Sequence, residues 1–233
     1  VRFCADLNDA FVQTIAESDE GNNCGSPWTN VTVSAASYAV TGSVVSGTGS
    51  VSVAASPISA GTSTTVTVTP AANNFTKSAT GSAGCNGGSL AGNVFTTGLV
   101  TGACNVSFTL MFGTLTPGPT TSCTIVLNGT SCTASLTRSV TNPITVGGSA
   151  VTSPTGTPSP SNGDTGAVTF TAPYNAAGVN FFLYNTGNLV AQTNVATNCT
   201  AGTSWSGTLC ANIAPVANAG PDKAITLPTS TSA

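Results

Sequence analysis

The stretch Val106-Ser107-Phe108-Thr109-Leu110-Met111-Phe112 carries the pattern that decides the fold of this chain. Apolar and hydroxyl-bearing side chains alternate along most of it, as expected for an extended strand with one face buried and the other in water. The same alternation recurs at Val66-Thr67-Val68 and at Val168-Thr169-Phe170, and helical periodicity is absent apart from a short stretch near residues 11–16. Clusters of Gly, Pro and Asn separate such stretches at roughly 8–12 residues, the spacing typical of a β-sandwich. The sequence therefore predicts an all-β protein.

Residues 179–192 contain the clearest hairpin signal. Asn185-Thr186-Gly187-Asn188 lies between two apolar runs, and Gly and Asn tolerate the positive φ that a tight turn requires. Because alternate side chains of a strand face opposite sides, one of Phe181 and Phe182 is expected to be exposed or covered by a neighbouring subunit.

Charge is scarce along the whole chain. The 233 residues include 7 Asp or Glu, 4 Lys or Arg and no His, so charged residues make up 5% of the chain, against about 25% in typical domains. The hydrophobic fraction of 40% and the net charge of −3 favour a folded protein over a disordered one. No basic patch is present to attract nucleic acid. A near-neutral surface favours association between copies, which suits a polymer or a surface layer.

Eight cysteines fall in four close sequential pairs. The pairs are Cys4/Cys24, Cys85/Cys104, Cys123/Cys132 and Cys199/Cys210. An even count, without His and without Cys-x-x-Cys spacing, predicts disulfides and argues against a zinc site or a redox pair. Disulfides persist in oxidising compartments, so we expect an extracellular protein. Sequential pairing is the expectation, and cross-pairing within residues 113–210 is the alternative.

The chain lacks the residues that enzymes most often use for catalysis. Without His there is no ordinary Ser/His/Asp set, and a lysine base would have to be Lys77 or Lys223. Lys–Asn cross-links, which occur in some surface stalks, would need the same two lysines. No apolar run approaches the roughly eighteen residues that a membrane-spanning helix needs. We therefore expect neither an enzyme nor a membrane span.

The acidic residues near the start of the chain are the candidate metal ligands. They are Asp6, Asp9, Glu17, Asp19 and Glu20. Calcium takes oxygen ligands, several of them from carboxylates, and this cluster could supply them. The alternative is a solvated loop closed by Cys4 and Cys24, in which Asp, Asn and Gly serve as turn residues. No other cofactor is expected.

Two further groups of residues suggest contact with sugars. Asn-x-Ser/Thr sequons, the candidate glycosylation sites, occur at Asn30, Asn74, Asn105, Asn128 and Asn198. Asn105 alternates with buried-type residues and should face solvent. Aromatic rings that could stack on a sugar are Trp28, Trp205 and the Phe181–Tyr184 hairpin, although packing at the core or its rim is the alternative for both tryptophans.

The chain divides into four segments, three of which resemble known bacterial surface modules. Residues 1–34 contain Arg2-Phe3-Cys4-Ala5-Asp6 and Trp28-Thr29-Asn30-Val31-Thr32-Val33, and with these they resemble the closing hairpin of the CARDB-type adhesion domain. Residues 35–112 contain Thr64-Thr65-Val66-Thr67-Val68-Thr69-Pro70 and Gly87-Gly88-Ser89-Leu90-Ala91-Gly92-Asn93, which resemble the internalin-type bacterial β-repeat. Residues 211–233 contain Pro215-Val216-Ala217-Asn218-Ala219-Gly220-Pro221-Asp222 and resemble the opening strands of a PKD-type domain. Residues 113–210 resemble Ig-like domains in general and no particular module.

These resemblances imply tandem Ig-like β-sandwich domains with local disulfides and incomplete strands at both ends. They also imply a structural subunit or stalk of a bacterial extracellular fibre or adhesin, whose partners are copies of itself placed head to tail. The C-terminal strand could complete the N-terminal hairpin of the next subunit. The residues expected at that junction are Phe3, Val31, Val33, Ile225 and Leu227. The alternatives are a segment of a giant multidomain adhesin and a module that binds cell-surface glycans or a receptor.

Overall fold

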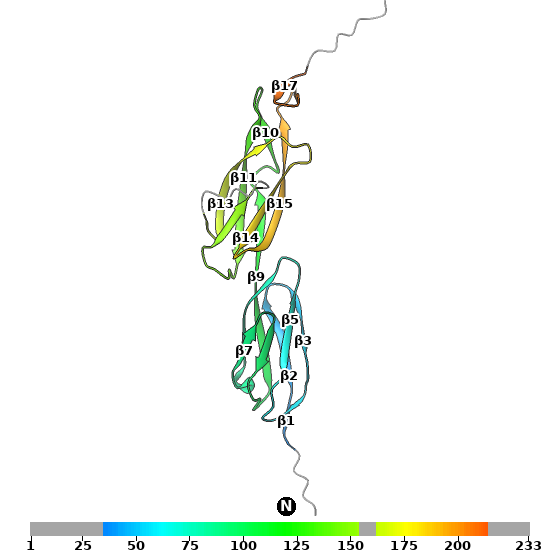
Figure 1. The fold of residues 1–233 in the computed structure, drawn as a ribbon, viewed down its shortest axis with the longest axis vertical. Helices are drawn as coiled ribbons and strands as arrows, with labels where there is room; N and C mark the ends of the chain where they lie inside the picture. The colour runs from blue at the N-terminus through cyan, green and yellow to red at the C-terminus, as the bar shows by residue number, and fades with distance from the viewer. Residues whose placement is uncertain (1–34, 154–161, 214–233) are drawn as a thin grey trace, which may run out of the picture.

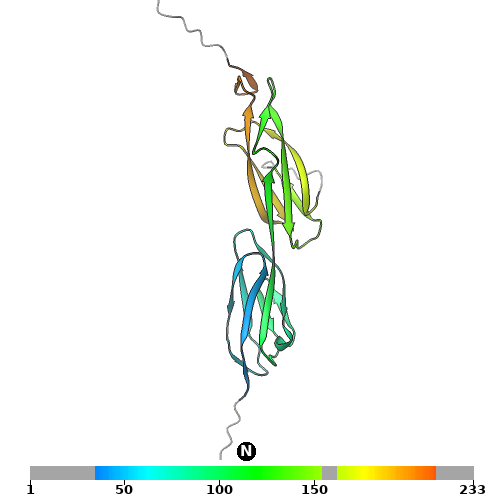
Figure 2. The same ribbon diagram turned by 180° about the vertical axis from the view of Figure 1, so that it is seen from behind.

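The computed structural model describes residues 35–153 and 162–213. Within these ranges the chain is almost entirely β, and its helical content is one short 3-10 turn, η1 (Ala83–Cys85). Two lobes lie end to end along the long axis of the molecule, as Figures 1 and 2 show. We call residues 35–111 the first lobe and residues 112–213 the second lobe. The described helices include none that is long and apolar enough to cross a membrane.

The first lobe consists of two main sheets that enclose one core, with β1 and β4 paired as a separate two-stranded sheet. Its strands are β1 (Ser37–Tyr38), β2 (Val40–Ser46), β3 (Gly49–Val53), β4 (Ile58–Ser59), β5 (Thr65–Pro70), β6 (Phe75–Gly81), β7 (Gly88–Ala91), β8 (Val94–Thr97) and the first half of β9 (Cys104–Pro117). One sheet has the order β3-β5-β8-β7, and in the other β9 lies between β2 and β6. The pair β2–β9 is parallel, whereas the other pairs in these sheets are antiparallel.

The core of the first lobe follows from the alternation along its strands. Val66 and Val68 of β5 are buried against Val106, Phe108 and Leu110 of β9, and Phe108 is fully inaccessible to solvent. Hydroxyl side chains occupy the intervening positions, because successive residues of a strand point to opposite faces. The burial pattern of β9 therefore agrees with the alternation that predicts this strand.

The second lobe also has two sheets around a separate core. Its strands are the second half of β9, β10 (Ser122–Ile125), β11 (Ser131–Thr141), β12 (Ser149–Thr152), β13 (Thr165–Pro173), β14 (Val179–Asn185) and β15 (Asn188–Cys199), followed by a small hairpin of β16 (Thr203–Trp205) and β17 (Cys210–Asn212). One sheet has the order β9-β11-β13 and the other β10-β15-β14-β12. The pair β10–β15 is parallel.

The hairpin of β14 and β15 has the two-residue turn that its sequence predicts. The positive φ angles fall on Thr186 (51°) and Gly187 (78°), so Thr186 takes a conformation that the sequence suggested for Asn. Phe181 faces the core and packs on Phe170 with 5.2 Å between ring centroids. Phe182 lies half-buried on the opposite face. The outward-facing and more accessible member of the Phe181/Phe182 pair is therefore Phe182.

Three disulfides tie the ends of strands together. Cys85–Cys104 joins η1 to the start of β9, Cys123–Cys132 joins β10 to β11 across the two sheets of the second lobe, and Cys199–Cys210 joins β15 to β17. Each bond connects cysteines that are neighbours in sequence order, and the pair Cys4/Cys24 lies outside the described residues. Loops of 19, 9 and 11 residues correspond to about 3 kcal/mol of stabilisation each in the chain-entropy model.

The opposite environments of the two phenylalanines give a matched test of the fold. Phe181→Ala removes a buried ring and should lower the free energy of unfolding by about 3–5 kcal/mol. Phe182→Ala, one residue further along the same strand, should cost about 1 kcal/mol, since its ring is already partly in water. Chemical denaturation under oxidising conditions measures both. Equal losses from the two variants would contradict the orientation of β14.

Candidate functional site at the junction of the two lobes

The two lobes share a strand instead of being joined by a linker. Residues 104–109 of β9 pair with β2 and residues 106–111 pair with β6, whereas residues 112–117 pair with β11. The change of partner therefore falls between Met111 and Phe112, and no residue of β9 lacks a strand neighbour at this point. Figure 1 shows β9 running from one lobe into the other.

The buried face of β9 also changes at the junction. Val106, Phe108 and Leu110 belong to the core of the first lobe, whereas Met111 and Leu115 belong to the core of the second lobe. Because alternate residues point to opposite faces, the two cores lie on opposite sides of this one strand. The step occurs at the consecutive buried residues Leu110 and Met111, where the sequence alternation is interrupted.

Gly113 allows β9 to approach the rest of the second lobe closely. A Cβ atom at this position would lie 3.0 Å from the Ser139 carbonyl oxygen and 3.2 Å from Cγ2 of Val190. Such contacts are tighter than ordinary van der Waals packing, so a larger residue would push β9 away from β11 or from β15. Gly113 is therefore favoured by close packing and not by a turn.

Side chains brace the junction beside β9. The Asn142 side chain, just after β11, donates from Nδ2 to Ser46 Oγ (2.8 Å) and to the Leu110 carbonyl oxygen (3.0 Å) of the first lobe. Phe75, the first residue of β6, packs against the core of the second lobe. These contacts join the lobes in addition to the shared strand and favour a fixed angle between them.

A buried amide holds the loop that follows Asn142. Asn185 is inaccessible to solvent, and its Oδ1 accepts hydrogen bonds from the backbone N–H groups of Ile144 (3.1 Å) and Thr145 (3.2 Å). Its Nδ2 donates to the Thr145 carbonyl oxygen and to Ser149 Oγ, both at 2.9 Å. All these groups are satisfied, as a buried polar network requires if it is to stabilise the fold. The loop that begins at Asn142 is therefore held in place by hydrogen bonds, which also fixes the position of the Asn142 side chain.

The network continues to the one acidic residue within the described ranges, Asp164. Its carboxylate accepts from Ser149 Oγ and from the Gly147 backbone N–H, both at 2.6 Å. Arg138 lies on the core-facing side of β11 and is 4% exposed. Burial lowers the pKa of the Arg138 guanidinium, and the charge of Asp164 acts in the opposite direction. A buried cation needs such a compensating charge, so we interpret this pair as structural.

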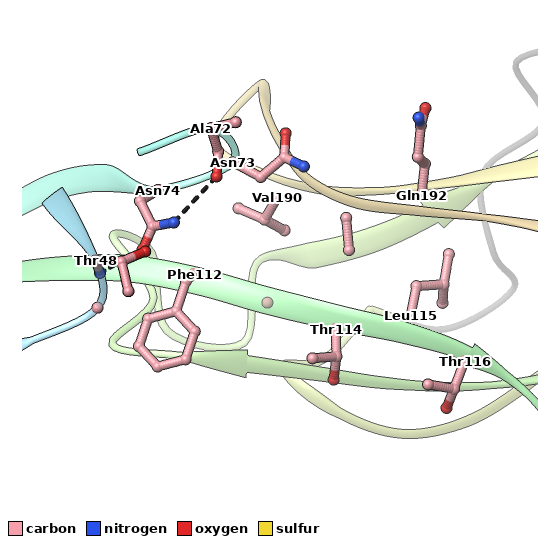
Figure 3. Close-up of a pocket in the computed structure, with 13 residues that line it drawn as sticks. Thr48, Ala72, Asn73, Asn74, Phe112, Thr114, Leu115, Thr116, Val190 and Gln192 are labelled. Carbon is pink, nitrogen blue, oxygen red and sulfur yellow. Dashed lines mark hydrogen bonds between the residues drawn. The ribbon is translucent and has the colours of Figure 1, made fainter. Parts of the chain in front are cut away.

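A cleft lies along the edge of β9 that faces away from β11. Its volume is about 580 Å³, and none of its lining side chains is charged. The lining residues are Gly47, Thr48, Ala72, Asn73, Asn74, Phe112, Gly113, Thr114, Leu115, Thr116, Val190, Ala191 and Gln192. They come from two turns of the first lobe, from β9 and from β15, as Figure 3 shows.

Hydrogen bonds order the first-lobe end of the cleft. Asn74 Nδ2 donates to the Ala72 carbonyl oxygen at 3.0 Å, and Asn74 Oδ1 accepts from the Thr48 backbone N–H at 3.0 Å (Figure 3). This side chain links the β2–β3 turn to the β5–β6 turn. Because Asn74 is a candidate glycosylation site, a sugar attached there would replace one of the two N–H groups of Nδ2 at the mouth of the cleft.

The remaining sequence candidates lie elsewhere in the described chain. Asn105, Asn128 and Asn198 are exposed, and Lys77 is exposed on β6. Trp205 stacks on Tyr174 with ring centroids 4.4 Å apart and an interplanar angle of 10°, so one face of its ring is covered. Neither this pair nor Phe182 lines the cleft. The aromatic residue at the cleft is Phe112, which sequence analysis singled out only as part of a strand.

Several predicted sites fall outside the described residues. These are the acidic cluster Asp6, Asp9, Glu17, Asp19 and Glu20, the residues Phe3, Trp28, Asn30, Val31 and Val33, and the C-terminal residues Lys223, Ile225 and Leu227. Within residues 35–153 and 162–213 no group of three or more His, Cys, Asp or Glu side chains could hold a metal ion. Calcium binding therefore stays a prediction about the first segment.

Comparison with family models, with curated proteins and with solved structures finds no match to this chain. The resemblances to CARDB-type, internalin-type and PKD-type modules accordingly stay predictions. Residues 35–153 and 162–213 show a nearly all-β architecture with several sheets and three disulfides.

The Asn142 brace predicts a measurable effect on the angle between the lobes. Asn142→Ala removes two hydrogen bonds across the junction, and we expect a wider spread of interlobe angles in small-angle X-ray scattering. The free energy of unfolding should fall by only about 1–2 kcal/mol, because each lobe keeps its own core. Asn105→Ala is the control, since the bonds of Asn105 to Thr41 and Ser107 lie within the first lobe. An unchanged scattering profile for Asn142→Ala would show that the brace is dispensable.

Proposed function

We propose that this chain is a structural segment of a bacterial extracellular fibre or adhesin stalk that carries tension, built from tandem Ig-like β-sandwiches that assemble end to end. The observation that carries the proposal is the shared strand β9, which provides a continuous backbone path between the two lobes with no linker to extend. The three disulfides support a location outside the reducing cytosol.

The sheet order of the second lobe supports the Ig-like part of the proposal. Strands β9, β11 and β13 correspond to strands A, B and E of an Ig sandwich, and β12, β14 and β15 correspond to C, F and G. Strand β10 adds to the free side of β15. The first lobe departs from this order, because β9 is paired with β6 and not with the preceding strand β8.

Strand directions support a role under tension. In the first lobe the chain enters through β2 and leaves through the parallel strand β9, with Val40 opposite Cys104. Pulling the lobe along its long axis moves these strands in opposite directions, so all hydrogen bonds between them are loaded together and none can open first. The second lobe also contains a parallel pair, β10–β15, which holds the strand through which the chain leaves it. The chain enters this lobe through β9, which pairs with β11, so the shear geometry of the entering and leaving strands is a feature of the first lobe.

The surface supports assembly with other copies. The described ranges contain Lys77, Arg138 and Asp164 as their only Lys, Arg, Asp or Glu residues, and Arg138 is buried. Such a surface offers little electrostatic repulsion between neighbouring copies. The ends of the described chain lie at opposite ends of the long axis, which suits a head-to-tail arrangement (Figure 1).

Single-molecule pulling tests the proposed role under tension. Handles at Ala35 and Gly118 load β2 and β9 in shear, and we expect the first lobe to unfold at a markedly higher force than with handles at Ala35 and Thr101, which peel β2 from β9 one bond at a time. Unfolding under force reports the unfolding rate and not the equilibrium stability, so the direction of loading decides the outcome. Similar forces in the two geometries would contradict the role of the parallel pair.

Electron microscopy of the purified chain tests the fibre. We expect filaments whose repeat matches the two-lobed body, and the loss of these filaments when residues 218–233 are deleted, with residues 35–210 still folded by circular dichroism. An intact mass far above that of the 233 residues in native material would instead favour a longer, covalently continuous adhesin. Filaments that survive the deletion would exclude strand exchange through the C-terminal segment.

A further inference from the structure

We infer that the cleft at the junction is an acceptor for an added β-strand, and that the strand it takes is residues 224–227 of a second copy of this chain. This inference rests on the proposed function, because it supplies the contact by which copies would assemble. The sequence suggested the N-terminal hairpin as the acceptor, whereas the described part of the chain offers an acceptor of its own.

Two strand edges without a neighbour border the cleft. Among the described residues, the second half of β9 has β11 as its only partner, so the backbone groups on its other edge have no strand to pair with. Strand β15 has β14 on one side, and β10 joins its other side only at residues 196–199. Residues 190–192 therefore have no hydrogen-bonded strand on that side, where Val190 lies close to Gly113 of β9. Exposed edges of this kind are templates for pairing with another chain.

The shape of the cleft fits a short strand. Five consecutive residues of β9, from Phe112 to Thr116, line its length, which corresponds to about 17 Å of extended chain. The turns at Thr48 and Ala72–Asn74 close the end towards the first lobe (Figure 3). A strand of four or five residues would fill this length.

The chemistry of the cleft fits an uncharged strand with alternating side chains. Val190, Ala191 and Leu115 are buried residues that present apolar atoms to it. Threonine hydroxyls and the Gln192 amide supply polar groups beside them. A strand with apolar residues on one face and a hydroxyl on the other would satisfy both kinds of surface.

Residues 224–227 have this composition. Their sequence is Ala224-Ile225-Thr226-Leu227, with no charged residue, and Pro228 follows. Ile225 and Leu227 would share one face and could pack on the apolar atoms of the cleft, while Thr226 would face the other way. Pro228 lacks a backbone N–H and would end the pairing. No charge would have to be buried on either side.

Two other strand edges in this fold are already covered by a parallel strand. In the first lobe β2 covers one edge of β9 as a parallel strand, and in the second lobe the four-residue β10 covers part of β15. A further short strand beside residues 112–116 would extend this arrangement across the junction. It would also tie the neighbouring copy to both lobes at once.

Photo-crosslinking of the full chain tests the inference. A photoreactive residue in place of Gln192 should, on irradiation, yield covalent dimers and higher ladders whose crosslinked peptide contains residues 224–228 of another copy. The same residue in place of Thr169, which is exposed on the outer face of β13, should yield none. A crosslink from position 192 to residues 224–228 of the same chain, to residues 1–34 of another copy, or to no part of the chain would overturn the inference.

Charge substitutions separate this inference from the proposed function. Thr114→Arg and Gln192→Arg place a cation in the cleft and should reduce filament formation by about tenfold or more, because an unpaired charge is costly to bury, whereas Thr169→Arg should leave it unchanged. All three positions are exposed, so folding is expected to survive and is checked by circular dichroism. Normal filaments from both cleft variants would overturn the acceptor site while the fibre proposal stands. A wild-type chain that forms no filaments would overturn the fibre proposal itself.

Discussion

Strand β9 is the constraint on which the rest of the molecule depends. It gives even-numbered residues to the first core and odd-numbered residues to the second, so one strand has to satisfy two sets of packing partners. The change of core falls at the consecutive buried residues Leu110 and Met111, and Gly113 allows β9 to come close to β11 and β15. The backbone hydrogen bonds continue through the change of lobe, because β11 takes over as partner where β6 ends.

Polar groups in the second lobe are arranged to keep this junction ordered. Asn185 and Ser149 are fully buried, and together with Asp164 they hold the loop that carries Asn142. Buried polar groups of this kind contribute little net stability but are costly to leave unsatisfied, so they favour one arrangement over its competitors. In a chain with so few charges, Arg138 and Asp164 therefore serve the interior of a lobe and contribute little to the surface.

Much of the fold follows from the sequence, because period-two alternation and turn residues are local signals. The alternation at residues 106–112 and 168–170 predicts strands that the structure contains, and Gly187 predicts the turn between β14 and β15. The junction is less accessible to such reasoning. Nothing in the local pattern of β9 says that its two halves serve different lobes, although the adjacent Leu110 and Met111 are a signal of a change of face. The inward position of Arg138 could have been found, since it is in phase with Leu136 and Val140. The cleft could not, because β9 and β15 are far apart in the sequence and meet only in the folded chain.

The continuity of β9 also fixes the rotation of the second lobe relative to the first about the axis of this strand. Since side chains alternate at every residue, the position of the second core around the strand axis is set by counting residues from the first core. A single extra residue inserted after Met111 would present the opposite face of the strand to the second lobe and turn that lobe over by about half a revolution relative to the first. Length variation of the kind that ordinary interdomain linkers tolerate would therefore change the orientation of one lobe relative to the other.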